Sequence, residues 1–177
     1  AVASGVAAPS IVGDVRFGGG DDLFDIADGS VKGTTYFGAG NNRLALSGDA
    51  VYSGTARFGA GDDTMTLAGT SVFNGTADFG GGADTLTIGG TAVFSAGLVN
   101  SQGLAVSVGG GTFDVIGSGT ISSLAVTDKG SLGVTLGGGS STALQVTGNA
   151  SFAAESKLIL KLSSLAQAEG QHVVLTA

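Results

Sequence analysis

The chain has 177 residues, of which 42% are hydrophobic and none is cysteine, so it can bury a core but can form no disulfide or thiolate metal site. Its formal net charge of -7 argues against nucleic acid as a partner, because binding a phosphate backbone needs a basic patch. The 34 glycines lack the every-third spacing of collagen and punctuate β-branched residues, which is typical of many short strands and turns.

After a flexible lead-in at 1–10, one ten-residue motif recurs four times. The copies begin at Phe17, Phe37, Phe58 and Phe79. They are 20, 21 and 21 residues apart, and the third copy reads FGAGDDTMTL. A fixed period of this length is typical of a solenoid, in which each repeat stacks on its neighbours. The regular repeats span 11–97. The alternating apolar segments and glycine clusters continue through 98–177 with less regular spacing.

Each regular repeat contains three apolar segments. In the third copy, 63–67 alternates polar and apolar residues as a half-buried strand does. Further strands follow at 71–73 and 76–79, after glycine turns near Gly69 and Gly75. Three strands and three turns in about 21 residues predict an all-β fold, a right-handed parallel β-helix with looser coils in the C-terminal half.

The alternation also predicts which side chains point inward. Three inward columns are expected: Phe17, Phe37, Phe58 and Phe79; Phe24, Leu44, Met65 and Leu86; and Ile26, Leu46, Leu67 and Ile88. The position before each phenylalanine is expected to face water: Arg16, Tyr36, Arg57 and Asp78. Charged side chains cannot share a buried column cheaply, so this constrains the register.

A further column is expected in the second strand, where Lys32, Tyr52, Phe73 and Phe94 take equivalent places. The lysine indicates an outward column, which exposes three stacked aromatic rings. Either these rings cover one another or a neighbouring segment, or they form a contact surface for a partner, since exposed apolar patches often mark one. Tyr52, Phe73 and Phe94 are therefore the candidate contact surface.

In the tail, 156–162 is the most apolar strand, and 163–170 is the one place where a helical turn is expected. Catalytic motifs are scarce throughout the chain. His172 is the single histidine, and we interpret it as an ordinary surface residue. Neither a GxSxG elbow nor a GxxxxGK[ST] phosphate loop occurs. The neighbouring acids at 62–63 point different ways, which disfavours a polysaccharide-cleaving enzyme. The sequence therefore predicts no enzyme and no catalytic or cofactor-binding residue.

The repeated motif, FGxGxDxΦxΦ with Φ apolar, resembles the calcium-binding nonapeptide of RTX proteins. The calcium-binding aspartate of that family falls on Asp22, Asn42, Asp63 and Asp84. In the family, carboxylates and turn carbonyls enclose Ca²⁺, a hard cation that prefers oxygen ligands. Here phenylalanine replaces the first glycine, and the motif occurs once per coil instead of every nine residues. The alternative is structural: glycine permits the turn and the acid or amide hydrogen-bonds its backbone. No metal-binding residue is assigned.

Taken together, the chain resembles the passenger domain of a bacterial autotransporter, a type V secretion protein. The repeats resemble a passenger stalk. The segments GTFDV, GSLGVTL, ALQVTGNASF, SKLILKL and GQHVVLTA, within 109–177, resemble the C-terminal junction or autochaperone segment.

The resemblance implies a secreted or cell-surface fragment exported across the outer membrane by a C-terminal β-barrel of the same precursor. It implies a rigid structural or adhesive role, with a ligand on a cell surface or matrix and a C-terminal part that promotes folding during secretion. A calcium-binding RTX-like module is the alternative function, and an enzyme acting on polysaccharide ranks below both.

Overall fold

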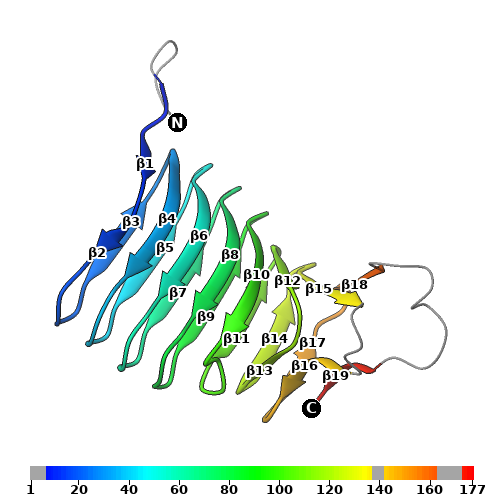
Figure 1. The fold of residues 1–177 in the computed structure, drawn as a ribbon. Coiled ribbons are helices and arrows are strands. Elements are labelled where there is room, and N and C mark those ends of the chain that lie inside the picture. Colours follow the sequence, from blue (N-terminus) through cyan, green and yellow to red (C-terminus); the bar gives the residue numbers. More distant parts are fainter. Residues whose placement is uncertain (1–6, 137–141, 163–172) are drawn as a thin grey trace.

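The computed structural model describes residues 7–136, 142–162 and 173–177 (Figure 1). Within these ranges the protein is all-β: parallel strands stack in coils of about 21 residues, giving a β-solenoid of about six turns. The predicted fold class is therefore confirmed. Among the described residues, no helix is long and apolar enough to cross a membrane.

The strands follow one another along the stack (Figure 1). In chain order they are β1 (Ser10–Val12), β2 (Val15–Arg16), β3 (Leu23–Ile26), β4 (Ser30–Tyr36), β5 (Arg43–Leu46), β6 (Val51–Arg57), β7 (Thr64–Leu67), β8 (Val72–Asp78), β9 (Thr85–Gly89), β10 (Val93–Val99), β11 (Ala105–Gly109), β12 (Thr112–Val115), β13 (Gly119–Ile121), β14 (Ser123–Thr127), β15 (Ser131–Leu136), β16 (Thr142–Val146), β17 (Ala150–Phe152), β18 (Lys157–Leu162) and β19 (Val173–Thr176). The segment at 163–170, where a helical turn was expected, lies outside the described residues.

Three parallel sheets run along the solenoid. The nine-stranded sheet has the order β1-β4-β6-β8-β10-β12-β15-β18, with β2 also paired to β4. The seven-stranded sheet has the order β17-β14-β11-β9-β7-β5-β3, and β13, β16 and β19 form a three-stranded sheet. Each interior strand thus pairs with its counterparts in the coils before and after it, which satisfies the backbone polar groups along the stack.

The regular coils contain two strands where the sequence predicted three. The expected second and third strands merge into one, as in β8, which passes through the predicted turn at Gly75. Gly75 has a φ of 135°, and it lies in register with Gly54 and Gly33. A Cβ atom on Gly54 would overlap the backbone carbonyl of Gly33, so glycine lets the strand bend without losing its pairing.

The three predicted inward columns are confirmed. Phe37, Phe58 and Phe79 are buried, and their rings stack at centroid distances of 4.7 and 5.5 Å. The aliphatic columns that begin at Phe24 and Ile26 are packed into the same core, whose seven-stranded side continues through Val106 and Val108. Aromatic stacking therefore acts along the N-terminal and central coils, and apolar burial continues beyond them.

The apolar segment predicted at 156–162 forms β18, which pairs with β15 at one end of the nine-stranded sheet. Two of its leucines remain half exposed: Leu158 and Leu160 each keep 51% of their accessible surface. They continue the inward column that includes Leu132 and Val134, which are fully buried one coil earlier. Position at the end of the sheet, rather than composition, therefore sets their exposure.

Candidate functional site

The aromatic contact surface predicted at Tyr52, Phe73 and Phe94 is wrong. All three side chains have no accessible surface. Their rings stack inside the solenoid at 4.9 and 5.4 Å, and Phe113 extends the column. The Tyr52 hydroxyl stays satisfied in the core, because it donates to the Thr55 carbonyl at 2.9 Å. These residues build the core and cannot contact a partner in the folded protein.

The error comes from a one-residue difference between coils. Val31 pairs with Tyr52, whereas Lys32 pairs with Ser53 on the outer face. The first coil is one residue shorter, and the missing residue lies between Ile26 and Val31. Counting back from the phenylalanine that starts the next copy places Val31 and Tyr52 at the same offset, so the sequence did contain the signal.

The calcium-motif residues form a hydrogen-bonded column, which we call the inner ladder. Its members are Asp22, Asn42, Asp63 and Asp84. Each backbone N–H donates to the side chain one coil later, at 3.0 Å from Asp22 to Asn42, 2.7 Å from Asn42 to Asp63 and 2.9 Å from Asp63 to Asp84. The structural alternative expected the acid or amide to hydrogen-bond the backbone of its own turn. Asn42 does so, and the side-chain oxygens of Asn42, Asp63 and Asp84 also join neighbouring coils.

A second column, the outer ladder, runs beside it in the opposite direction. Asn41, Asp62 and Ala83 each donate a backbone N–H to the side chain one coil earlier. The acceptors are Asp21, Asn41 and Asp62, at 2.7, 2.8 and 2.8 Å. Two consecutive Asp or Asn residues thus give each turn a bond to the coil before it and a bond to the coil after it. This explains why the acids occur as neighbouring pairs.

The inner ladder leaves one carboxylate oxygen of each aspartate without a partner. Asp63 and Asp84 are 1% exposed, and the Oδ2 atoms of Asp22, Asp63 and Asp84 are buried with no hydrogen bond. Burial raises the pKa of the Asp63 and Asp84 carboxyls, because desolvation disfavours the ionised form. Asp62 raises the pKa of both carboxyls further, against the lowering effect of the ladder hydrogen bonds.

Asn42 shows what fits at this position. Its Nδ2 donates to the carbonyl of Gly40, two residues earlier, at 3.0 Å. A protonated aspartate can donate in the same way, whereas an ionised one cannot. No three acidic, histidine or cysteine side chains in the described part of the chain lie together as a metal site requires. Because Asn42 carries an amide where the other coils carry a carboxylate, the motif residues do not form a continuous column of Ca²⁺ carboxylate ligands; calcium binding by an RTX-like module stays a prediction.

The outer face of the nine-stranded sheet carries a different arrangement. Arg16, Tyr36 and Arg57 occupy paired positions in three successive coils. The Arg16 Cζ lies 4.0 Å from the centroid of the Tyr36 ring, and the Arg57 Cζ lies 5.9 Å from it. Guanidinium groups at this range are attracted to the face of the ring. The prediction that this row faces water is confirmed, but its stacking was not foreseen.

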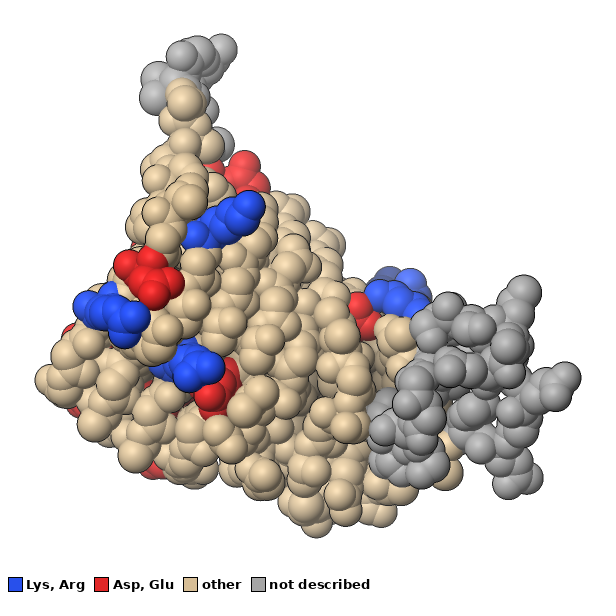
Figure 2. All heavy atoms as spheres, in the orientation of Figure 1, with Lys and Arg blue, Asp and Glu red and all other residues tan. Residues whose placement is uncertain are grey.

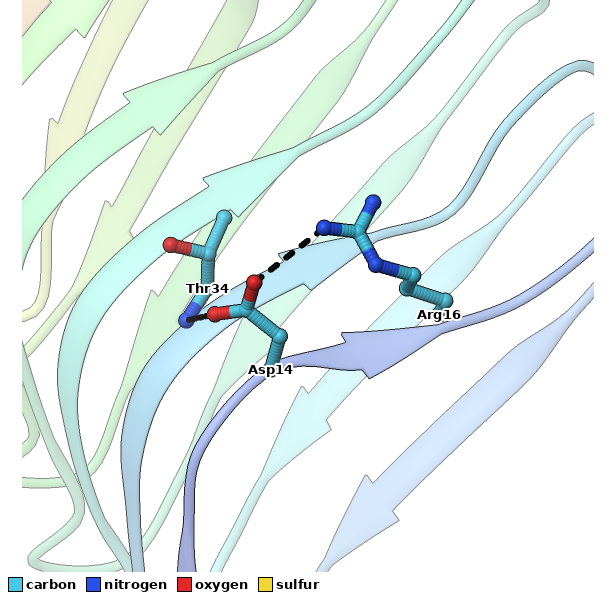
Figure 3. Close-up of polar contacts among 3 residues, drawn as sticks. All are labelled: Asp14, Arg16 and Thr34. Carbon is cyan, nitrogen blue, oxygen red and sulfur yellow. Dashed lines mark hydrogen bonds and ion pairs between the residues drawn. The ribbon is translucent and has the colours of Figure 1, made fainter.

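Asp14 fixes one end of this row. Its carboxylate accepts a hydrogen bond from Arg16 Nη2 at 3.2 Å and from the backbone N–H of Thr34 at 3.3 Å (Figure 3). Both members of the ion pair are well exposed, so it contributes little to stability. Its effect is to hold the Arg16 side chain in one orientation.

The C-terminal coils contain one buried acid with a cationic partner. Asp114 Oδ2 accepts hydrogen bonds from Lys161 Nζ at 2.7 Å and from Ser95 Oγ at 2.8 Å. Lys161 belongs to β18, two coils beyond β12, so the pair ties the end of the sheet to its interior. A buried acid with a dedicated lysine is explained as a structural link. His172 lies outside the described residues.

Comparison of the chain with protein-family models, with curated proteins and with solved structures finds no match in any of the three.

Proposed function

We propose that the chain is a rigid structural and adhesive part of an exported protein, of the kind that forms the passenger domain of a bacterial autotransporter. The observation that carries this is the unbroken stack. The nine-stranded sheet extends from β1 to β18, and buried aromatic columns follow the same axis. Such a stack holds its outer side chains at regular spacings along an extended surface. In this proposal the chain acts by display and contact, not by catalysis.

The secretion part of the proposal rests on the resemblance of the repeats and the tail to autotransporter passengers. The chain would be carried across the outer membrane by a β-barrel in the same precursor and would remain at the surface or be released. The segment 98–177 would promote folding as the chain emerges. Its strands continue the sheets of the repeats, so it can provide a paired edge on which earlier coils assemble.

Display on a bacterium tests this proposal. The chain is placed between a signal peptide and the membrane barrel of a known autotransporter, and intact cells are treated with protease. The proposal expects a surface-exposed product with a protease-resistant core and increased attachment of the cells to host-cell matrix. Retention inside the cell, or export as a fully digestible chain, would contradict the secretion part. Unchanged attachment would contradict the adhesive part.

Two deletions test the role of the tail in folding. Removing 98–177 should leave an exported chain that protease digests. Removing one whole repeat, 47–67, shortens the stack but keeps the tail, so resistance should persist. Equal resistance of both variants would show that the tail has no special role.

A further inference from the structure

The strongest unassigned feature is the cationic face, which we define as the outward row Arg16, Tyr36 and Arg57 with the adjoining Lys32 and the threonine row between them. Three of the seven basic residues of this acidic chain lie here. Figure 2 shows most basic and acidic side chains of the visible face over the N-terminal coils, and a smaller charged group toward the C-terminal coils, with a broad uncharged area between them.

The two acids on this face are already engaged by the protein. Asp14 bonds to Arg16 and to the Thr34 backbone. Asp78, which pairs in register with Arg57, accepts hydrogen bonds from the Gly80 N–H at 3.3 Å and from Asn100 Nδ2 at 2.8 Å.

Two of the three cations on this face make no ion pair among the described residues. Within the described chain, Arg57 and Lys32 have no ion-pair partner. The face therefore carries three cations against two acids, a net charge of +1, and two of its cations make no ion pair in this part of the chain.

One of these cations, Arg16, is also held in place before any partner arrives. Arg16 is fixed by Asp14 and by the Tyr36 ring, and Tyr36 is anchored in a strand paired on both sides. Less side-chain entropy is then lost on binding, which favours affinity. Guanidinium groups present a planar fork of donors that matches carboxylate and sulfate oxygens.

The remaining side chains of the face indicate a carbohydrate. Thr34, Thr55 and Thr76 form an outward hydroxyl row, one per coil, beside Ser53 and Asn74. Hydroxyl and amide groups match the hydroxyls of a sugar. The row advances about 4.8 Å per coil, which is comparable to the length of a sugar ring. A peptide has no free edge to extend here, since β4, β6 and β8 are interior strands of the sheet.

We propose that the cationic face binds an anionic polysaccharide, whose chain runs along the solenoid axis with its carboxylate or sulfate groups on Arg16 and Arg57. This inference rests on the adhesive role proposed above and gives it a ligand class.

The test measures binding of the full chain to heparin and to polygalacturonate, which separate sulfate from carboxylate recognition. Neutral dextran and poly-L-glutamate serve as comparison polymers. We expect binding to at least one anionic polysaccharide, little binding to either comparison polymer, and weakening as ionic strength rises from about 0.05 to about 0.5 M. Absence of binding to both anionic polysaccharides, or equal binding of poly-L-glutamate, would overturn the proposal.

The matched variants are Arg16→Gln/Arg57→Gln and Lys129→Gln/Lys157→Gln, which remove the same charge from different places. Loss of two exposed ionic contacts should weaken polysaccharide binding about tenfold in the first variant only. Equal affinities of the two variants would overturn the assignment to this face. Thermal melts confirm that both variants are folded. If the wild-type chain is displayed at the cell surface but binds no anionic polysaccharide, the proposed ligand is wrong and the proposed secretion is not affected.

Discussion

At the residue scale, the inner ladder places carboxyl groups where a neutral side chain fits better than an ion. Asp63 presents Oδ2 where Asn42 presents a donating amide, and that oxygen has no partner. The equivalent carbonyl two residues before Asp63 belongs to Gly61. An ionised carboxylate there is desolvated and leaves that oxygen without a partner, whereas a protonated one, like the Asn42 amide, has a hydrogen to donate. Relative to the unfolded chain, folding therefore raises the pKa of Asp63 and Asp84.

Substitution of Asp63 separates its two roles. Asp63→Asn keeps the acceptor for the Asn42 N–H and adds a donor toward Gly61, so at pH 7 the free energy of unfolding should equal or exceed that of the wild type. Asp63→Ala leaves the Asn42 N–H buried without a partner and should cost about 1–3 kcal/mol. Urea unfolding measures both. If the asparagine variant were as unstable as the alanine variant, the ionised form would be the one the fold requires.

The pH dependence follows from the raised pKa values of Asp63 and Asp84. Folding favours their protonated forms, so their contribution to stability is full below the unfolded-state pKa of about 3.9 and is lost as pH rises through the higher folded-state pKa. Between those pH values the stability of the wild type should fall relative to Asp63→Asn/Asp84→Asn. Parallel pH profiles of the two proteins would refute this.

A melting temperature that calcium raises in the wild type, but not in the double variant, would support a bound metal instead of a proton.

Much of this residue-level picture was visible in the sequence, and its failures have physical causes. The motif identified the turn acids, but it could not show that their bonds cross between coils, because the partner lies about 21 residues away. The aromatic column was assigned to the wrong face because Lys32 was aligned with Tyr52 across a coil one residue shorter. In a strand, a one-residue shift moves every side chain to the opposite face.

At the element scale, the strands are held in register by columns of like residues. Phe73 shows the strength of one such column, since it is fully buried between Tyr52 and Phe94. Phe73→Ala should lower the free energy of unfolding by about 3–5 kcal/mol, because it removes ring contacts and leaves a cavity. Asn74→Ala, on the exposed side of the same strand, should change stability little. A small effect of Phe73→Ala on stability would contradict the burial of this side chain in the core.

Glycine bends make the long strands possible. Gly54→Ala places a methyl group against the neighbouring backbone at a φ of 150°, so it should destabilise the protein by more than about 1 kcal/mol. Gly19→Ala is the control, since a Cβ atom there has no neighbour within 4 Å and its φ is not in the left-handed region. Thermal unfolding of the two variants compares them. Equal stabilities would mean that the bend relaxes freely.

At the scale of the whole molecule, the period of the repeat was sufficient to predict the solenoid, and the alternation was sufficient to predict most of its core. The number of strands per coil could not be predicted from the pattern. A glycine in register with other glycines bends a continuous strand, whereas the sequence pattern predicted a turn between two strands. The exposure of β18 was not predictable either, since its composition resembles a core strand and only its place in the sheet leaves it half covered. The composition of a segment therefore predicts that it forms a coil, and the position of its strands in the sheet determines which side chains stay exposed.

The register of the coils is the claim on which the buried aromatic column, the two ladders and the cationic face all depend. The chain has no cysteine, so an engineered pair reports distance directly. Ser53 and Asn74 are paired in adjacent coils, and Ser95 lies one coil further. Adjacent strands are about 4.8 Å apart, within the Cα range of a disulfide, and two coils span about twice that distance. Under mild oxidation in dilute solution, Ser53→Cys/Asn74→Cys should form an intramolecular disulfide and Ser53→Cys/Ser95→Cys should not. A disulfide in the second variant but not in the first would contradict the stacked register.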